Sequence, residues 1–304
     1  MLTSKTSQII QEIQNKTSAL EEIHALFEFH NMQISFDLFN QDHWCHYAFM
    51  DSLKKLALMT RANFNSIETF GLVSTTRYIF ELNIRLTLIE QDSRHGLVYY
   101  GVLLKDQVDY WKTLKEQLDR EVAFLNNMDN EERNLHRIKL LEYSKIEDPE
   151  LQKEFALTLA TDIFNTIDNI AARKFSIHAE QARTNGYGFQ AVLISKNQLP
   201  DVNTSMTKVE SEYDLFKKTV SPEILKIIKN WRWKQNAIKI NCLAEYDYIY
   251  SFTSRMLHAT PANITTNNKF LSHDEIIIFL KYINVKLADI IKLSKKFITN
   301  PTKL

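Results

Sequence analysis

The chain has 304 residues, of which 44% are hydrophobic and 11% aromatic, a composition that builds a packed core and excludes a largely disordered protein. Lysine plus arginine and aspartate plus glutamate both number 37, so no net charge attracts nucleic acid to the molecule as a whole. Glycine and proline number only five each, too few for the many turns of a β-rich protein. We therefore predict an all-α fold, a multi-helix bundle with long helices.

No stretch of the sequence approaches the roughly 18 apolar residues of a membrane span. The N-terminal sequence MLTSKTSQIIQEIQNK lacks the pattern of a secretory signal peptide. We expect a cytoplasmic protein with no membrane partner. The two cysteines, Cys45 and Cys242, have no CxxC spacing, so we expect neither a disulfide framework nor a metal site, and no cofactor.

Apolar residues recurring at helical spacing predict a series of helices in the first two-thirds of the chain. These cover residues 4–30, 46–65, 66–91, 95–127 and 149–184. Pro149 suits a helix start, because its missing N–H is not needed in the first turn. A shorter, acidic helical segment separates the last two helices, and from Glu116 to Glu154 the sequence has eleven acidic and six basic residues.

The most irregular segment is TNGYGFQAVLISKNQLPDVNTS, residues 184–205, in which FQAVLIS resembles a strand. We interpret it as a connector between an N-terminal helical lobe, 1–183, and a C-terminal helical lobe, 206–304, that pack as one compact unit. The C-terminal lobe should contain three more helices. These cover residues 221–231, 235–259 and 273–298.

The stretch YDYIYSFTSRMLHATP carries the first candidate site. Tyr246, Tyr250, Ser254 and His258 recur every four residues and would form one polar stripe on a helix. A histidine near a helix end can act as acid or base, and Arg255 can stabilise a developing negative charge. The alternative is that these groups are interior residues whose hydrogen bonds are satisfied within the fold.

The second candidate is TTRYIFELNIRL, where Arg77, Glu81 and Arg85 lie four residues apart on an otherwise apolar helix. Charges on so apolar a helix pair with one another or face a polar pocket. An ordinary structural ion pair between residues i and i+4 explains the same spacing.

The R-x3-E helix of Arg77 and Glu81, the Y-x3-Y-x3-S-x3-H helix ending at His258, and the ATP-x-NI sequence after it together resemble an uncharacterised bacterial family of all-helical proteins. The likeness extends from about residue 60 to 290. More loosely, that family resembles the HEPN superfamily, many of whose members are metal-independent ribonucleases. The resemblance implies an up-and-down helical core and a homodimer.

HEPN ribonucleases use an arginine and a histidine four to six residues apart on one helix. Arg255 and His258 have only two residues between them and depart from this pattern. Arg173 and His178 in ARKFSIHAE enclose four residues and form a secondary catalytic candidate. Such a spacing also arises by chance in a chain of this composition, so it ranks below His258.

The segment KKTVSPEILKIIKNWRWKQNAIK is basic and aromatic. Arg232 and Lys234 could follow a phosphate backbone, and Trp231 and Trp233 could stack on bases. A solvated helix face with two core tryptophans explains the same residues.

The leading functional hypothesis is a HEPN-like, metal-independent ribonuclease or RNA-binding effector of a bacterial toxin or phage-defence system. It would have Ser254, Arg255, His258, Arg77 and Glu81 as catalytic residues, RNA as a substrate or partner, and a partner protein of such a system. The alternative is a non-catalytic helical scaffold or ligand-sensing interaction protein. The two differ in geometry: an open cleft favours a site, and a sealed set of mutual hydrogen bonds favours a scaffold.

Overall fold

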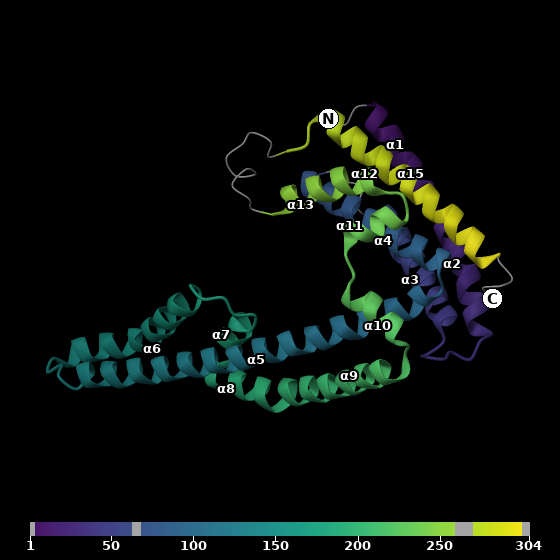
Figure 1. Ribbon diagram of the computed structural model, residues 1–304. Helices are drawn as coiled ribbons and strands as arrows, with labels where there is room; N and C mark the ends of the chain where they lie inside the picture. The colour runs from purple at the N-terminus through teal and green to yellow at the C-terminus, as the bar shows by residue number, and fades with distance from the viewer. Residues whose placement is uncertain (1–3, 63–67, 259–269, 300–304) are drawn as a thin grey trace. The chain divides into compact units, whose positions relative to one another are not determined.

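All regular structure in the described part of the chain is helical. The computed structural model describes residues 4–62, 68–258 and 270–299, and these ranges contain α-helices and short π-helical segments but no strand (Figure 1). The predicted all-α class is confirmed. Within the same ranges, no helix combines the length and the apolar character needed to cross a membrane.

The chain divides into two compact units. The first consists of Met1–Leu103 with Phe216–Leu304, and the second of Leu104–Leu215. Each unit has its own hydrophobic core. The units therefore do not coincide with the expected lobes, 1–183 and 206–304, because helices from both ends of the chain share the first core.

The first unit contains helices from both the N-terminal and the C-terminal part of the chain. These include one end each of α5 and α9, which continue into the second unit. On the N-terminal side these are α1 (Ser4–Gln14), α2 (Thr17–Met32), α3 (Gln41–Ala62), α4 (Thr69–Gln91) and the start of α5 (Arg94–Tyr143). On the C-terminal side these are the end of α9 (Leu199–Thr219), α10 (Pro222–Lys229), α11 (Trp233–Lys239), α12 (Leu243–Glu245), the π-helical segment η2 (Tyr246–Tyr250), α13 (Ser251–Leu257) and α15 (His273–Ile298).

Helix α4 lies in the middle of the first core. Helices α3, α13 and α15 and the segment η2 all contact it. Its buried residues include neighbours in sequence, such as Leu72 with Val73 and Ile79 with Phe80, so more than one face of the helix is covered. A helix that is apolar on several faces is stable only in the interior. Any charged side chain on α4 must therefore find a partner or a pocket.

Helix α15 covers α4 and also contacts α1 and α2 (Figure 1). A capping box fixes its start, since the Ser272 hydroxyl accepts from the Glu275 backbone and the Glu275 carboxylate accepts from the Ser272 backbone. Phe279, Ile283 and Leu287 are fully buried at spacings of four residues. This spacing places one apolar face on the core, and the predicted helix over 273–298 is confirmed.

The second unit is built around the rest of α5. Its other elements are α6 (Pro149–Ala171), α7 (Ala179–Asn185), α8 (Tyr187–Leu193), the π-helical segment η1 (Ile194–Gln198) and the start of α9. Asp148 caps α6 by accepting from the Glu150 backbone at 2.9 Å, and Pro149 occupies the first turn as predicted.

The segment 184–205 is helical, and its prediction as an irregular connector with a strand-like run was wrong. Tyr187, Gln190, Ala191 and Ile194 are its buried residues in α8 and η1. Their spacing of three, four and seven residues is that of one helix face. The β-branched residues of FQAVLIS pointed to a strand, whereas the burial pattern required by the core of the second unit selects a helix.

The predicted helix over 149–184 is interrupted after Ala171. Glu121, only 2% exposed, causes a local turn because its carboxylate accepts from the Ser176 hydroxyl at 2.6 Å and from the Ile177 backbone at 3.1 Å. A buried carboxylate requires such donors. The interruption therefore depends on a residue fifty positions upstream.

Two further predicted boundaries need correction. The helix expected over 95–127 continues to Tyr143, so no separate helix lies between it and α6. The helix expected over 235–259 is divided into α11, α12, η2 and α13, and its last predicted residue lies outside the described ranges. Asn241 ends α11 with a φ of 60°, a left-handed conformation that asparagine tolerates better than most residues.

Candidate functional site

The arginine–glutamate pair predicted on α4 is present and partly buried. Arg77 Nε donates to Glu81 Oε1 at 3.0 Å, and the two side chains are 23% and 26% exposed. The Arg77 guanidinium also lies over the ring of Tyr250, 4.5 Å from its centroid. Both contacts restrict the rotamers of Arg77, which in turn holds the Glu81 carboxylate in place along α4.

The tyrosines of η2 continue this arrangement. The ring of Tyr250 stacks on that of Tyr246 at 4.8 Å with an interplanar angle of 15°. Glu245, directly before η2, anchors the segment to α15 by accepting from the Tyr282 hydroxyl at 2.8 Å and from Lys286 Nζ at 3.0 Å. Burial lowers the pKa of Lys286, but the hydrogen bond to Glu245 and its charge outweigh burial and raise the pKa overall.

We call Arg77, Glu81, Tyr246 and Tyr250 the α4 polar seam. Its members contact one another, and only Glu81 among them also lines a pocket. By the criterion of an open cleft against mutual contacts, this part of the predicted site favours a structural role.

The tryptophans predicted to stack on nucleic-acid bases contact an arginine of the same chain. The Arg85 guanidinium carbon lies 4.9 Å from the ring centroid of Trp231 and 5.1 Å from that of Trp233. The two indole rings meet edge to face at 5.6 Å. Arg232 and Lys234 are exposed, and Lys234 Nζ lies 3.5 Å from Asp247 Oδ1.

A pocket of about 270 Å³ opens beside the seam. Three helices line it: α3, α4 and the first turns of α5. Its lining residues are Asp51, Ser52, Lys55, Tyr78, Glu81, Leu82, Arg85 and Tyr99. We call this the polar pocket. It contains two carboxylates, two cations and two phenols, while the sequence analysis had singled out only Glu81 and Arg85 among its residues.

The two phenols of the polar pocket are held in their neutral form. Burial raises the pKa of Tyr99, and the nearby Asp51 charge raises it further while Arg85 lowers it. Burial also raises the pKa of Tyr78, with a smaller contribution from Tyr99. Lys55 Nζ lies 5.0 Å from the centroid of the Tyr78 ring. Near neutral pH the pocket therefore offers two hydroxyl donors between charges of both signs.

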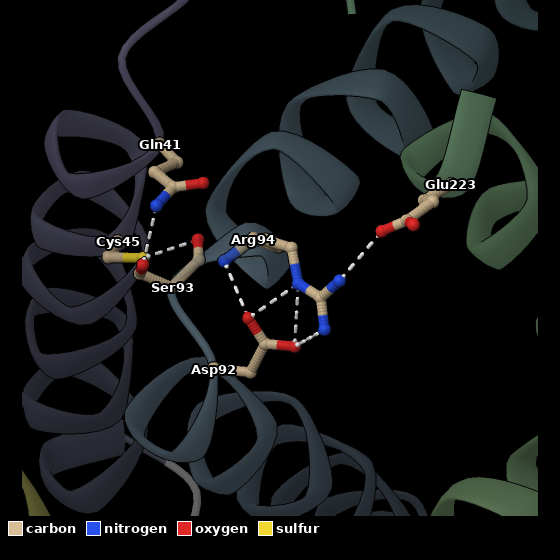
Figure 2. Close-up of polar contacts among 6 residues, drawn as sticks. All are labelled: Gln41, Cys45, Asp92, Ser93, Arg94 and Glu223. Carbon is tan, nitrogen blue, oxygen red and sulfur yellow. Dashed lines mark hydrogen bonds and ion pairs between the residues drawn. The ribbon is translucent and has the colours of Figure 1, made fainter. Parts of the chain in front are cut away.

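Polar contacts tie the turn between α4 and α5 to α3 (Figure 2). Gln41 Nε2 donates to Ser93 Oγ at 2.7 Å, and the Cys45 thiol donates to the Ser93 carbonyl at 3.3 Å, which ties the turn to α3. Asp92 accepts from the Arg94 backbone at 3.0 Å. The α3, α4 and α5 walls of the polar pocket are thus joined at one end.

Arg94 extends this network to α10. Its guanidinium pairs with Asp92 at 2.8 Å and with Glu223 at 2.9 Å (Figure 2). The hydrogen bonds from Arg94 hold the pKa of Asp92 below its ordinary value against the opposing effect of burial.

The remaining residues of the first predicted site lie elsewhere. Arg255 and His258 are exposed, Ser254 is half-buried, and none of the three lines the polar pocket. The predicted stripe does not reach His258, because α13 ends at Leu257 and the backbone of His258 is extended.

The secondary candidate does not form the predicted arrangement of two side chains on one helix. Arg173 is exposed in the turn after α6, and His178 is the N-cap residue of α7. The Glu121 turn described above separates them from any common helix. The Arg173 and His178 spacing therefore has no helical periodicity.

Sequence reasoning missed most of the polar pocket. Asp51 and Lys55 are four residues apart on α3, a signal of the same kind as that of Arg77 and Glu81, but α3 has other exposed charges that hid it. Tyr78 and Tyr99 appeared as ordinary apolar positions. Only their convergence from separate helices identifies them.

The described residues include no group of three or more histidine, cysteine, aspartate or glutamate side chains placed to hold a metal ion. Comparison of the chain with protein family models, curated proteins and solved structures gives no match. The resemblance to an all-helical bacterial family stays a prediction.

Proposed function

We propose that this protein is a ligand-sensing interaction protein whose first unit binds a small polar molecule in the polar pocket. The observation that carries the proposal is the convergence of Asp51, Lys55, Glu81 and Arg85 with two neutral phenols around one opening. Binding sites commonly combine a concave surface with a few converging polar groups. On this proposal the α4 polar seam supports the pocket, because Arg77 holds the carboxylate of Glu81.

The charges of the polar pocket favour a small zwitterion of the amino-acid class. Lys55 and Arg85 suit a carboxylate, and Asp51 and Glu81 suit an ammonium group. A pocket of about 270 Å³ lies just below the range of sites for drug-sized molecules, which starts at roughly 300 Å³, and suits a smaller ligand. A zwitterion presents both signs of charge, as the lining of the polar pocket does.

The experiment is a thermal-shift screen of the whole chain with the twenty amino acids, followed by calorimetry on those that raise the Tm. Lys55→Ala should weaken binding roughly tenfold or more, the expected loss of one charge-assisted hydrogen bond. Lys54→Ala is the matched control, since Lys54 is an exposed neighbour on α3 that does not line the pocket. Equal affinities of the two variants, or the absence of any binding amino acid, would contradict the proposal.

A metal-independent ribonuclease or RNA-binding effector of a toxin or phage-defence system is the second candidate. Two observations favour it: Arg255 and His258 are both exposed to a substrate, and α13 packs directly on α4. In this mechanism His258 would move a proton and Arg255 would stabilise the phosphate charge.

The second candidate predicts cleavage of total RNA or tRNA by the wild-type protein with EDTA present, and its loss in His258→Ala. His273→Ala, at another exposed histidine, should cleave normally. Circular dichroism would show that the variants are folded. Intact RNA with the wild-type protein, or full cleavage by His258→Ala, removes this candidate.

A further inference from the structure

The outer part of the second unit is a two-helix hairpin that has no interior of its own. From residue 131 to 162, across the end of α5 and the start of α6, no residue is buried. The two helices lie side by side (Figure 1), and the rings of Tyr143 and Phe155 meet at 6.1 Å. A two-helix hairpin can bury only one stripe of each helix, so the remaining apolar side chains face solvent.

Large apolar side chains occupy these solvent-facing positions. Their exposed fractions range from 49% to 74%. They are Ile138, Leu140, Leu141, Leu151 and Leu157. Such a concentration on a short hairpin marks a surface that another molecule covers.

One face of α5 in the hairpin is shallowly hollowed and carries arginines. A groove of about 630 Å³ is lined by Arg133, His136, Arg137, Leu140, Leu141 and Ser144. Leucines therefore lie beside arginines, of which Arg133 also pairs with Asp129, one turn earlier on α5, at 2.9 Å. Its chemistry suits an amphipathic helix that carries acidic and apolar residues.

The α6 side of the same hairpin has the matching chemistry. Glu147, Asp148, Glu150 and Glu154 are all exposed, and Lys153 is the single basic residue among residues 147–154. Leu151 and Leu157, exposed at 54% and 74%, lie within or next to this acidic stretch. One hairpin thus presents a helix face that carries arginines and leucines on α5 and an acidic, leucine-containing stretch at the start of α6.

We propose that two copies of this chain associate through the α5–α6 hairpin, with the basic groove on α5 of each copy receiving the acidic start of α6 of the other. A two-fold axis repeats this contact, so the basic and acidic helices of both copies are paired at once. The product is a four-helix bundle with the exposed leucines in its interior. A different partner would have to supply the acidic helix that each chain already contains.

The test measures the molar mass of the full chain by light scattering coupled to size-exclusion chromatography at about 50 μM and low salt. The wild-type protein should elute at twice the 35.7 kDa of one chain. Arg133→Glu with Arg137→Glu should raise the dimer Kd at least tenfold, and so should Glu150→Lys with Glu154→Lys. These positions are exposed, and circular dichroism would check that helix content is unchanged.

Mixing the two charge-reversal variants gives the decisive result. In a mixed dimer the unchanged α5 of one variant meets the unchanged α6 of the other, and the acidic α5 variant meets the basic α6 variant. Both contacts then join opposite charges, so the molar mass of a dimer should return. If either variant alone dimerised with the same Kd as the wild-type protein, the hairpin would not be the interface. A wild-type monomer at this concentration, or no recovery on mixing, would also overturn the proposal.

Discussion

At the scale of single residues, two glycines show how closely the polar-pocket helices approach one another. A Cβ at Gly96 would lie 2.1 Å from the backbone oxygen of Gln41 and 2.8 Å from the Cys45 sulfur, so α5 meets α3 with no room for a side chain. At Gly71 the nearest atom to such a Cβ is the flexible side chain of Glu68 at 3.4 Å. Both glycines lie in helices, so alanine substitutions at the two positions differ mainly in the space available for the new methyl group.

We predict opposite effects for the two alanine substitutions. Gly96→Ala should lower the free energy of unfolding by about 2 kcal/mol or more, because the clash is with backbone that cannot rotate away. Gly71→Ala should raise it by about 0.5 to 1 kcal/mol, since alanine is the better helix former at an uncrowded position. Urea titration of the full chain measures both, and a shift in the same direction for the two variants would contradict the packing described here.

The candidate site could be predicted only where its residues share a helix. Arg77 and Glu81 lie four positions apart, and the spacing alone predicted their ion pair, which the structure confirms. Lys55, Glu81 and Tyr99 come from three helices, and no periodicity in the sequence connects them. Their pocket depends on helix packing, which binary patterns do not specify.

At the scale of the elements, helix starts were easier to predict than helix interruptions. Pro149 is a local signal and α6 begins where it indicated, and α15 begins at residue 273 as its apolar spacing predicted. The interruption after Ala171 depends on Glu121, a residue of another helix. A break that depends on tertiary contact leaves little trace in the local sequence.

The π-helical segments are a second element-scale feature that the sequence concealed. Tyr246 stacks on Tyr250 within η2, and the helix that continues this segment ends at Leu257. A prediction that extends one regular helix to residue 259 therefore places the tyrosines well and misplaces His258, whose backbone is extended. π-turns inside helices are frequent at functional sites, which agrees with the position of η2 against α4.

At the scale of the whole molecule, the all-α class followed from composition, whereas the division into units did not. The small number of glycines and prolines limits the number of turns, whatever the arrangement of the helices. The pairing of Met1–Leu103 with Phe216–Leu304 depends on which apolar faces meet. A division read along the chain cannot detect a core shared by its two ends.

The stability of the whole molecule should fall on mild acidification because of His95. This side chain is only 7% exposed and faces the ring of Trp231 at 6.3 Å. Burial lowers its pKa below the ordinary 6.5, the charge of Asp92 partly opposes this, and Lys239 and Arg94 add to the lowering. The folded protein therefore resists protonation of His95, whereas the unfolded chain accepts the proton at about pH 6.5.

The sign and the pH range follow from this difference. Above pH 6.5 the imidazole is neutral in both states, and the contribution of His95 to stability is complete. As the pH falls below 6.5, the unfolded chain binds a proton that the folded protein does not, and the free energy of unfolding drops by up to about 1.4 kcal/mol per pH unit. The loss ends only below the pKa of the folded state. In His95→Gln this contribution is absent at every pH.

Urea titrations at pH 7.5, 6.5 and 5.5 would therefore give a steeper decline for the wild-type protein than for His95→Gln, although the variant starts from a lower stability because it disturbs a buried position. The two proteins differ only at position 95, so the contributions of all other groups cancel in the comparison. Asp92, whose pKa is lowered from 3.8, acts in a separate and more acidic range. Parallel declines of the two proteins between pH 6.5 and 5.5 would mean that His95 takes up its proton in the folded state, and that its surroundings are more open than the contact with Trp231 implies.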